Sequence, residues 1–302
     1  MKKNLKHIIR NISDQLAGRS NLIVIFLLFG FITLSCEEKI NLELNTDKNS
    51  RLVVQGRITN RQEIQYVYLT RSGSYFSNDS TQAEEGAEVS ISGSINSVKL
   101  YEDWNNPGLY KTAFPVYGII GHTYTLNITT KDDKHYAATS YLDTVAGIDS
   151  ITAEYEFIKY LNHGYYKLRL YTQDPRGKGN IYMFNVYVND TLDDSNLSNT
   201  SFQTDEYFDG QYLHGVEFYY INEDRIIPGA NGIQVDMLSI SREEYDFNTA
   251  FLDETSYSGG LFSGPPANVP SNLKCIDKDG IDGLGFFGAS AVNSYRLTIF
   301  KK

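Results

Sequence analysis

Cysteine is almost missing from this sequence, whose 302 residues include only Cys36 and Cys275. A small domain held together by several disulfides is therefore excluded. If Cys36 is modified, as the leader described below indicates, Cys275 has no partner and an intramolecular disulfide cannot form. A lone cysteine is most often a small buried hydrophobic residue. Packing, and not cross-linking, must stabilise the fold.

Histidine is also scarce, and no catalytic pattern is visible. The five histidines lack the HxH and HExxH spacings of zinc enzymes, and the sequence has no Gly-x-Ser-x-Gly elbow and no P-loop. These absences favour a protein that is not an enzyme and that needs no cofactor. A surface hydrolase is the third alternative, and it predicts a polar cleft with convergent carboxylates.

Positive charge is in short supply. The chain has 27 Lys and Arg against 37 Asp and Glu, a formal net charge of −10. Five of these cations and one acidic residue lie in residues 1–35, so the rest of the chain carries 22 against 36, or −14. Such a surface repels nucleic acid and bare anionic lipid, and we expect neither as a partner.

Long apolar runs are limited to one, Leu22–Phe29, behind a basic leader. It is shorter than the roughly 20 residues of a transmembrane helix. The basic segment, the apolar run and the small Ser35 indicate a secretion signal over 1–35, and the cysteine directly after it indicates a bacterial lipoprotein signal with lipid on Cys36. Thr33 stands where such signals usually have Leu. An ordinary secretory peptide followed by a chance cysteine is the alternative.

Aromatic residues are abundant, with 23 Tyr and 16 Phe. Both favour strands. After a polar tether over 36–50, alternating strands recur every 8–12 residues or so, which predicts a mainly β fold. We expect an N-terminal immunoglobulin-like or transthyretin-like β-sandwich over 51–147, then a second antiparallel β domain over 148–302. The expected strands are 51–58, 64–70, 87–92, 98–101, 123–129, 135–140, 151–157, 165–172, 181–188, 216–220, 233–240 and 293–300.

One short helix is expected, at about 242–254. Ser241 and Glu244 form a capping-box pattern, in which the serine hydroxyl accepts from a first-turn amide and the glutamate reaches back. Between strands, 174–180 has the composition of a hairpin-type loop and 190–211 that of a long surface loop.

The best metal candidate is Asp277–Gly283, in which Asp277, Asp279 and Asp282 lie within six residues beside glycines. Oxygen ligands so spaced could wrap Ca²⁺, but an EF-hand loop needs a glutamate at its twelfth position, where this chain has Gly288. A solvated turn is therefore favoured over a calcium loop.

Aromatic side chains in expected loops are candidates for contact with a partner, since loops on a β scaffold carry binding residues. They are Tyr75, Phe76, Trp104, Tyr207, Phe208 and Phe262. The other tyrosines alternate within strands and are favoured as core or edge packing.

The order of several short pieces resembles the domain of unknown function 4249 family. These pieces are 52–58, 67–72, 85–91, 108–110, 118–128, 239–245, 265–273 and 283–288. The chain departs from the family pattern at Lys274–Ile281, which looks like a longer insertion.

The resemblance implies an outer-membrane lipoprotein of Bacteroidota, encoded beside a TonB-dependent receptor, in a family without an established activity. It implies a cell-surface binding partner of that receptor in nutrient uptake. Glu37 and Glu38 resemble the acidic surface-export tags of these bacteria, although a merely solvated tether explains them equally well. The alternative function is a structural or adhesive, fimbria-like lipoprotein that assembles by donating a strand.

Four tripeptides also match the O-glycosylation pattern that Bacteroidota use on exported proteins. Their hydroxyl residues are Ser80, Thr144, Ser150 and Thr191. About one such match is expected by chance from the composition. Sites within strands are the more readily explained as coincidence.

Overall fold

A computed structural model describes residues 50–73, 81–94, 96–193, 201–255 and 269–301. Over these residues the protein is mainly β, with several curled sheets consistent with β-sandwiches and one α-helix, as the sequence predicts. In the described part, no helix is both long enough and apolar enough to cross a bilayer.

The largest sheet has ten strands. Its order is β16-β8-β7-β4-β5-β6-β2-β1-β17, and β3 pairs with β2. The bounds are β1 (Leu52–Thr59), β2 (Tyr66–Arg71), β3 (Gln82–Ala83), β4 (Glu88–Ser92), β5 (Ser97–Asp103), β6 (Asn106–Thr112), β7 (His122–Thr129), β8 (His135–Leu142), β16 (Lys274–Cys275) and β17 (Leu284–Ser290).

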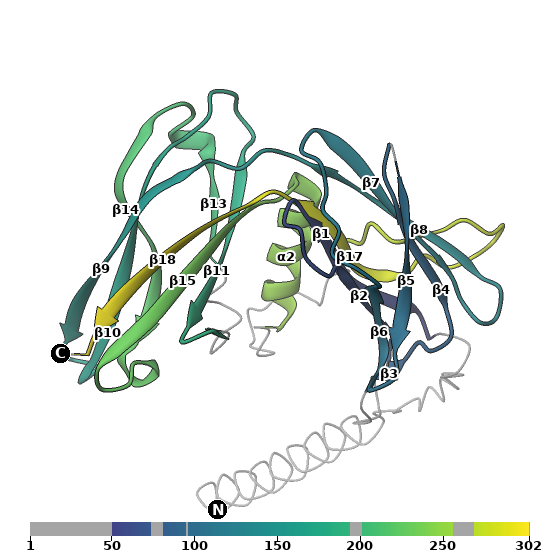
Figure 1. The fold of residues 1–302 in the computed structure, drawn as a ribbon, viewed down its shortest axis with the longest axis horizontal. Coiled ribbons are helices and arrows are strands. Elements are labelled where there is room, and N and C mark those ends of the chain that lie inside the picture. Colours follow the sequence, from purple (N-terminus) through teal and green to yellow (C-terminus); the bar gives the residue numbers. More distant parts are fainter. Residues whose placement is uncertain (1–49, 74–80, 95, 194–200, 256–268, 302) are drawn as a thin grey trace, which may run out of the picture. The chain divides into compact units, whose positions relative to one another are not determined.

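This sheet curls until β8 and β17 approach each other (Figure 1). The Ser140 hydroxyl accepts from the Ala289 amide, and the Asn272 side chain donates to the carbonyls of Thr139 and Phe287. Alternate residues of the strands point inward and form one core, with Leu52, Leu126 and others fully buried. A sandwich-like first lobe results.

The second lobe stacks two smaller sheets. A three-stranded sheet has the order β14-β10-β9, and a five-stranded sheet has the order β12-β11-β15-β18, with β13 paired to β11. The bounds are β9 (Ile148–Ile158), β10 (His163–Gln173), β11 (Ile181–Val188), β12 (Thr191–Leu192), β13 (Ser201–Thr204), β14 (Tyr212–Asn222), β15 (Ala230–Ser239) and β18 (Val292–Phe300), with the 3₁₀ turns η2 (Asp205–Tyr207) and η3 (Glu223–Arg225). A second hydrophobic cluster fills the space between them.

Helix α2 (Arg242–Thr255) confirms the predicted helix, but only half of the predicted capping box. The Ser241 hydroxyl accepts from the Glu244 amide at 3.1 Å. The Glu244 carboxylate does not reach back to the cap. It is buried and accepts from the guanidinium of Arg57 on β1, because a buried charge needs a partner of opposite charge more than a helix needs its second cap bond.

Two expected loops differ in the structure. Segment 174–180 is not a hairpin, because β10 and β11 belong to different sheets and the segment carries the chain across the sandwich. Segment 190–211 is not one surface loop, since β12 and β13 pair with β11 within it. Polar composition identified both segments as irregular but carried no information about pairing partners.

The chain also returns to the first lobe late in its sequence. Strand β17 pairs in parallel with β1, and β16 pairs with β8. Residues 274–290 thus add strands to the first sheet, although a simple division at 147/148 assigns them to the second domain. Residues 47–302 form one compact unit. The division into 51–147 and 148–302 stays a prediction.

Candidate functional site

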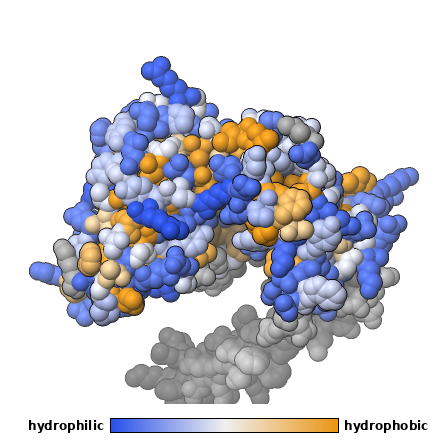
Figure 2. Space-filling model, in the orientation of Figure 1, coloured by the Kyte–Doolittle hydropathy of each residue, from blue (hydrophilic) through white to orange (hydrophobic). Residues whose placement is uncertain are grey.

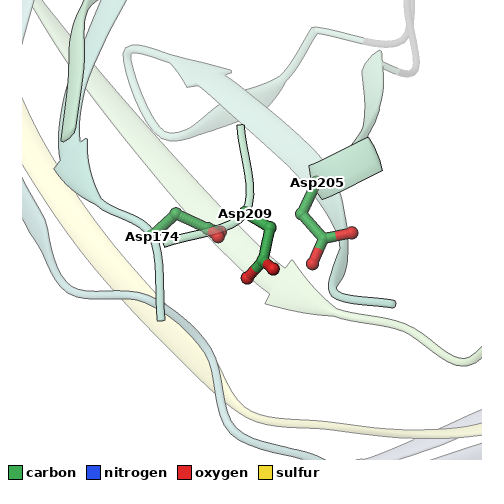
Figure 3. Close-up of side chains that lie close together, drawn as sticks. All are labelled: Asp174, Asp205 and Asp209. Carbon is green, nitrogen blue, oxygen red and sulfur yellow. The ribbon is translucent and has the colours of Figure 1, made fainter. Parts of the chain in front are cut away.

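Three aspartates that are far apart in sequence converge in the second lobe. Asp174 follows β10, Asp205 opens η2, and Asp209 lies four residues further on. One carboxylate oxygen from each lies within 4.8 Å of the others, and Figure 3 shows Asp205 at the short η2 turn near Asp174 and Asp209. Asp174 and Asp205 are buried. Among the described residues this is the one group of carboxylates that is close enough together to hold a metal ion.

The oxygens of this cluster already have donors from the protein. Asp174 accepts from the Tyr182 hydroxyl at 2.9 Å and from the Gly210 amide at 3.0 Å. Asp205 accepts from the amides of Gly179 and Asn180. The cluster therefore joins the 174–180 loop to the turn after η2. It acts as a clasp between loops, and we assign no metal to it.

Burial raises the pKa of Asp174, and the nearby carboxylates of Asp205 and Asp209 raise it further, against the lowering effect of the two donors. Burial also raises the pKa of Tyr182, and its bond to Asp174 adds to that shift. The clasp thus places a carboxyl group where its charged form is disfavoured.

A pH prediction follows from this shift. A carboxyl group whose pKa is raised in the folded state stabilises the fold at any pH below its ordinary pKa of about 4. That stability is lost as the pH rises through the raised pKa. We expect Asp174→Asn, whose side-chain carbonyl can still accept from Gly210, to lose less stability than the wild type as the pH rises from about 4 through the raised value. Urea unfolding midpoints across this range test it. The exposed turn variant Asp133→Asn should follow the wild type, and a parallel course for Asp174→Asn would contradict the prediction.

The metal candidates chosen from sequence do not converge. The Asp277 carboxylate accepts from the backbone amide of His135 and lies 3.0 Å from the ring Nδ1 of the same residue. Both contacts lower the pKa of Asp277. Asp282 accepts from the ammonium of Lys274 and the amide of Cys275, which lower its pKa too. Asp279 is exposed in a turn. The segment is a turn in the structure, and the choice of a solvated turn over a calcium loop stays a prediction.

Trp104 lies at the tip of the β5–β6 hairpin and is 97% exposed. Asp103 fixes this tip by accepting from Lys111 Nζ at 2.9 Å, from the Asn105 amide and from the Asn106 side chain. These bonds lower the pKa of Asp103 to about 2, and the bond with Lys111 contributes most. An exposed indole on a braced turn loses little freedom when it binds, which suits a contact residue.

A second exposed surface contains none of the residues that the sequence predicts as contacts. It consists of Phe114, Tyr117, Ile119 and Ile120 in the β6–β7 loop, with Ile64 before β2 and Tyr141 on β8, and we call it the loop surface. These six side chains are between 38% and 61% exposed. Residues 112–121 contain no charged side chain. Figure 2 shows that hydrophobic residues reach the surface in separate areas among hydrophilic ones on the face drawn.

The loop surface is held rigidly. Gly118 donates to the Thr59 carbonyl at 2.7 Å, Gly121 to the Leu142 carbonyl at 2.8 Å, and the Ile119 amide to the Tyr124 hydroxyl at 2.6 Å. Val116 and Glu63 exchange two backbone bonds. A hydrogen-bonded backbone thus holds these apolar side chains exposed to solvent, which is a feature of binding surfaces.

A family model described as Domain of unknown function (DUF4249) matches residues 37–296. The chain belongs to this family. The match spans both lobes and contains the Asp174 clasp, the Trp104 hairpin and the loop surface. No curated protein matches the chain.

Some of the remaining residues singled out in the sequence of this DUF4249 member lie in the part that the structure describes, and the others lie outside it. Thr144 is exposed between the lobes, Thr191 is exposed on β12, and Ser150 is half-buried on β9. Tyr207 is exposed on η2, Phe208 is partly buried behind it, and Cys275 is half-buried and free. Outside the described residues lie Cys36, Tyr75, Phe76, Ser80 and Phe262. Lipidation and glycosylation stay predictions.

Proposed function

We propose that this DUF4249 member is a lipoprotein anchored in the outer membrane through Cys36 and facing the cell exterior. There it acts as a binding partner of a TonB-dependent receptor in nutrient uptake. The leader sequence supports the anchor, and the family resemblance suggests the receptor. The observation that carries a binding role is the loop surface.

The loop surface has the properties of an interface core. Its side chains are aromatic or branched aliphatic, they lie at one end of the ten-stranded sheet, and the chain as a whole has an excess of acidic residues. Burial of such side chains against a partner is favourable at about 25 cal/mol per Å² of apolar surface. The well-bonded backbone keeps the entropy cost of ordering small. A receptor domain with a complementary apolar surface fits it.

The test is capture of the receptor from detergent-solubilised outer membranes with the native lipoprotein as bait. Substituting both Ile119 and Ile120 with serine should lower the recovered TonB-dependent receptor about tenfold or more, because each central apolar contact is worth over about 1 kcal/mol. Both side chains are more than 40% exposed, so the fold should tolerate the change. Quantitative mass spectrometry of the captured proteins measures it.

The matched control is Tyr160→Ser. Tyr160 is 86% exposed in the β9–β10 turn of the other lobe, and its loss should leave receptor capture unchanged. Receptor capture that survives the double substitution would remove the loop surface from the proposal. Capture of further copies of the chain in place of a receptor would favour the fimbria-like alternative.

A further inference from the structure

The described chain starts at one end of the ten-stranded sheet, which we call the tether end. Ser50 donates to the Ser72 carbonyl, and the Arg51 guanidinium donates to the carbonyls of Asp282 and Gly283. Strands β1 and β6 are both antiparallel to β2 and therefore begin at the same end. The Trp104 hairpin, which precedes β6, lies at the tether end.

Two further segments lie at this end. Strand β4 is antiparallel to β5, so it begins at the end where β5 leads into the Trp104 hairpin. Thr129, the last residue of β7, pairs with Glu88 at the start of β4, and the β7–β8 turn therefore belongs to the tether end. The Ile276 amide donates to the carbonyl of His135, which follows that turn. The 276–282 loop is thereby placed beside it.

Exposed apolar side chains mark the tips of these segments. Trp104 is 97%, Ile276 64% and Ile281 58% exposed. Tryptophan prefers the interfacial layer of a bilayer, where its ring is half solvated.

We propose that the tether end rests in the headgroup layer of the bilayer that holds the acyl chains of Cys36, with Trp104, Ile276 and Ile281 as the inserted side chains. The occupant of this surface is lipid, because the polypeptide joins the sheet here. The 14 residues from Cys36 to Ser50 span at most about 50 Å, so this end can reach the bilayer that holds the anchor. The inference rests on the lipid anchor of the proposed function.

This orientation has a consequence for the loop surface. Gly118 bonds to Thr59 at the far end of β1, so the loop surface lies at the opposite end of the strands from Trp104. Eight residues of strand correspond to about 26 Å. The loop surface therefore points away from the bilayer, toward parts of a receptor that project from the membrane.

The single tryptophan of the chain makes the test direct. The full-length acylated protein is reconstituted in phosphatidylcholine vesicles with or without lipids brominated near the headgroup, since bromine quenches indole fluorescence at short range. We expect bromination to lower Trp104 emission clearly, because an interfacial tryptophan lies at the depth of the headgroups. A variant with Trp104→Phe and Ile120→Trp moves the probe to the loop surface, and its emission should stay unchanged.

Flotation of the vesicles separates the two proposals. Protein that floats without quenching of Trp104, or with equal quenching at position 120, overturns the orientation and leaves the anchor standing. Protein that does not float overturns both. Receptor capture by the Trp104→Phe variant should equal that of the wild type, and a tenfold loss would reassign Trp104 to the receptor contact.

Discussion

Replacing Gly285 with alanine is expected to destabilise the protein by more than about 3 kcal/mol, because the change combines backbone strain with a steric clash at the centre of a strand pair. Gly285 has φ +80° and lies opposite Val54 in the parallel β1–β17 pair. A Cβ at this position would lie 1.9 Å from the Val54 carbonyl oxygen. Backbone atoms cannot rotate aside as a side chain can, so β17 would have to separate from β1. A shift of the urea midpoint at constant slope measures the effect.

Gly232→Ala is the matched control. Gly232 is also a strand glycine, on β15, but a Cβ there would meet no atom within 4 Å. Alanine usually strengthens a strand relative to glycine, so the change in stability should be below about 1 kcal/mol in either direction. Equal midpoints for the two variants would show that β17 does not add to β1 in this register.

The strand pattern explains which parts of the fold could be predicted. Strands such as β10 and β11, in which apolar residues alternate or run continuously, were predicted nearly to their ends. Strand β17 was missed, because two glycines and adjacent phenylalanines hide its alternation. Its partner β1 lies more than 220 residues earlier. Local composition contains no signal for so distant a parallel pair.

The sites were harder to predict for the same reason. Asp174 is about 30 residues from Asp205, and only the crossing of the chain between sheets brings their carboxylates together. Ile119 and Ile120 belong to a piece that supports the family resemblance, and their apolar side chains carry no sequence signal of exposure. The position of Trp104 in a turn could be predicted, because a tryptophan beside Asp and Asn residues indicates a turn, and its contact with a partner stays a prediction.

Removal of the Arg61 guanidinium is the second large effect that we expect. Arg61 follows β1 in the first lobe and forms a bidentate pair with Asp236 on β15, with N–O distances of 2.8 and 2.7 Å. The Asp236 side chain is 5% exposed and also accepts from Ser294 and Gln234. This pair, mainly through its hydrogen bonds, raises the pKa of Arg61 despite partial burial. It joins the two lobes.

Arg61→Ala leaves a buried carboxylate without its counter-charge. Such an uncompensated charge costs about 3–5 kcal/mol, whereas an exposed ion pair contributes about 1 kcal/mol at most. We therefore expect a loss of about 3 kcal/mol or more in the free energy of unfolding, measured by urea denaturation. Arg296→Ala is the control, since the Arg296 guanidinium bonds to Gln234 in an exposed position of the same sheet. The loss in the free energy of unfolding for this variant should be below about 1 kcal/mol.

A double substitution distinguishes lost charge compensation from lost packing. Asp236→Asn removes the buried charge while its amide still bonds to Ser294, so adding it to Arg61→Ala should restore about half or more of the lost stability. If packing of the Arg61 stem were the cause, the second change would restore nothing and the two losses would add. An additive result would therefore show that the Arg61–Asp236 pair does not hold the lobes together by its charge.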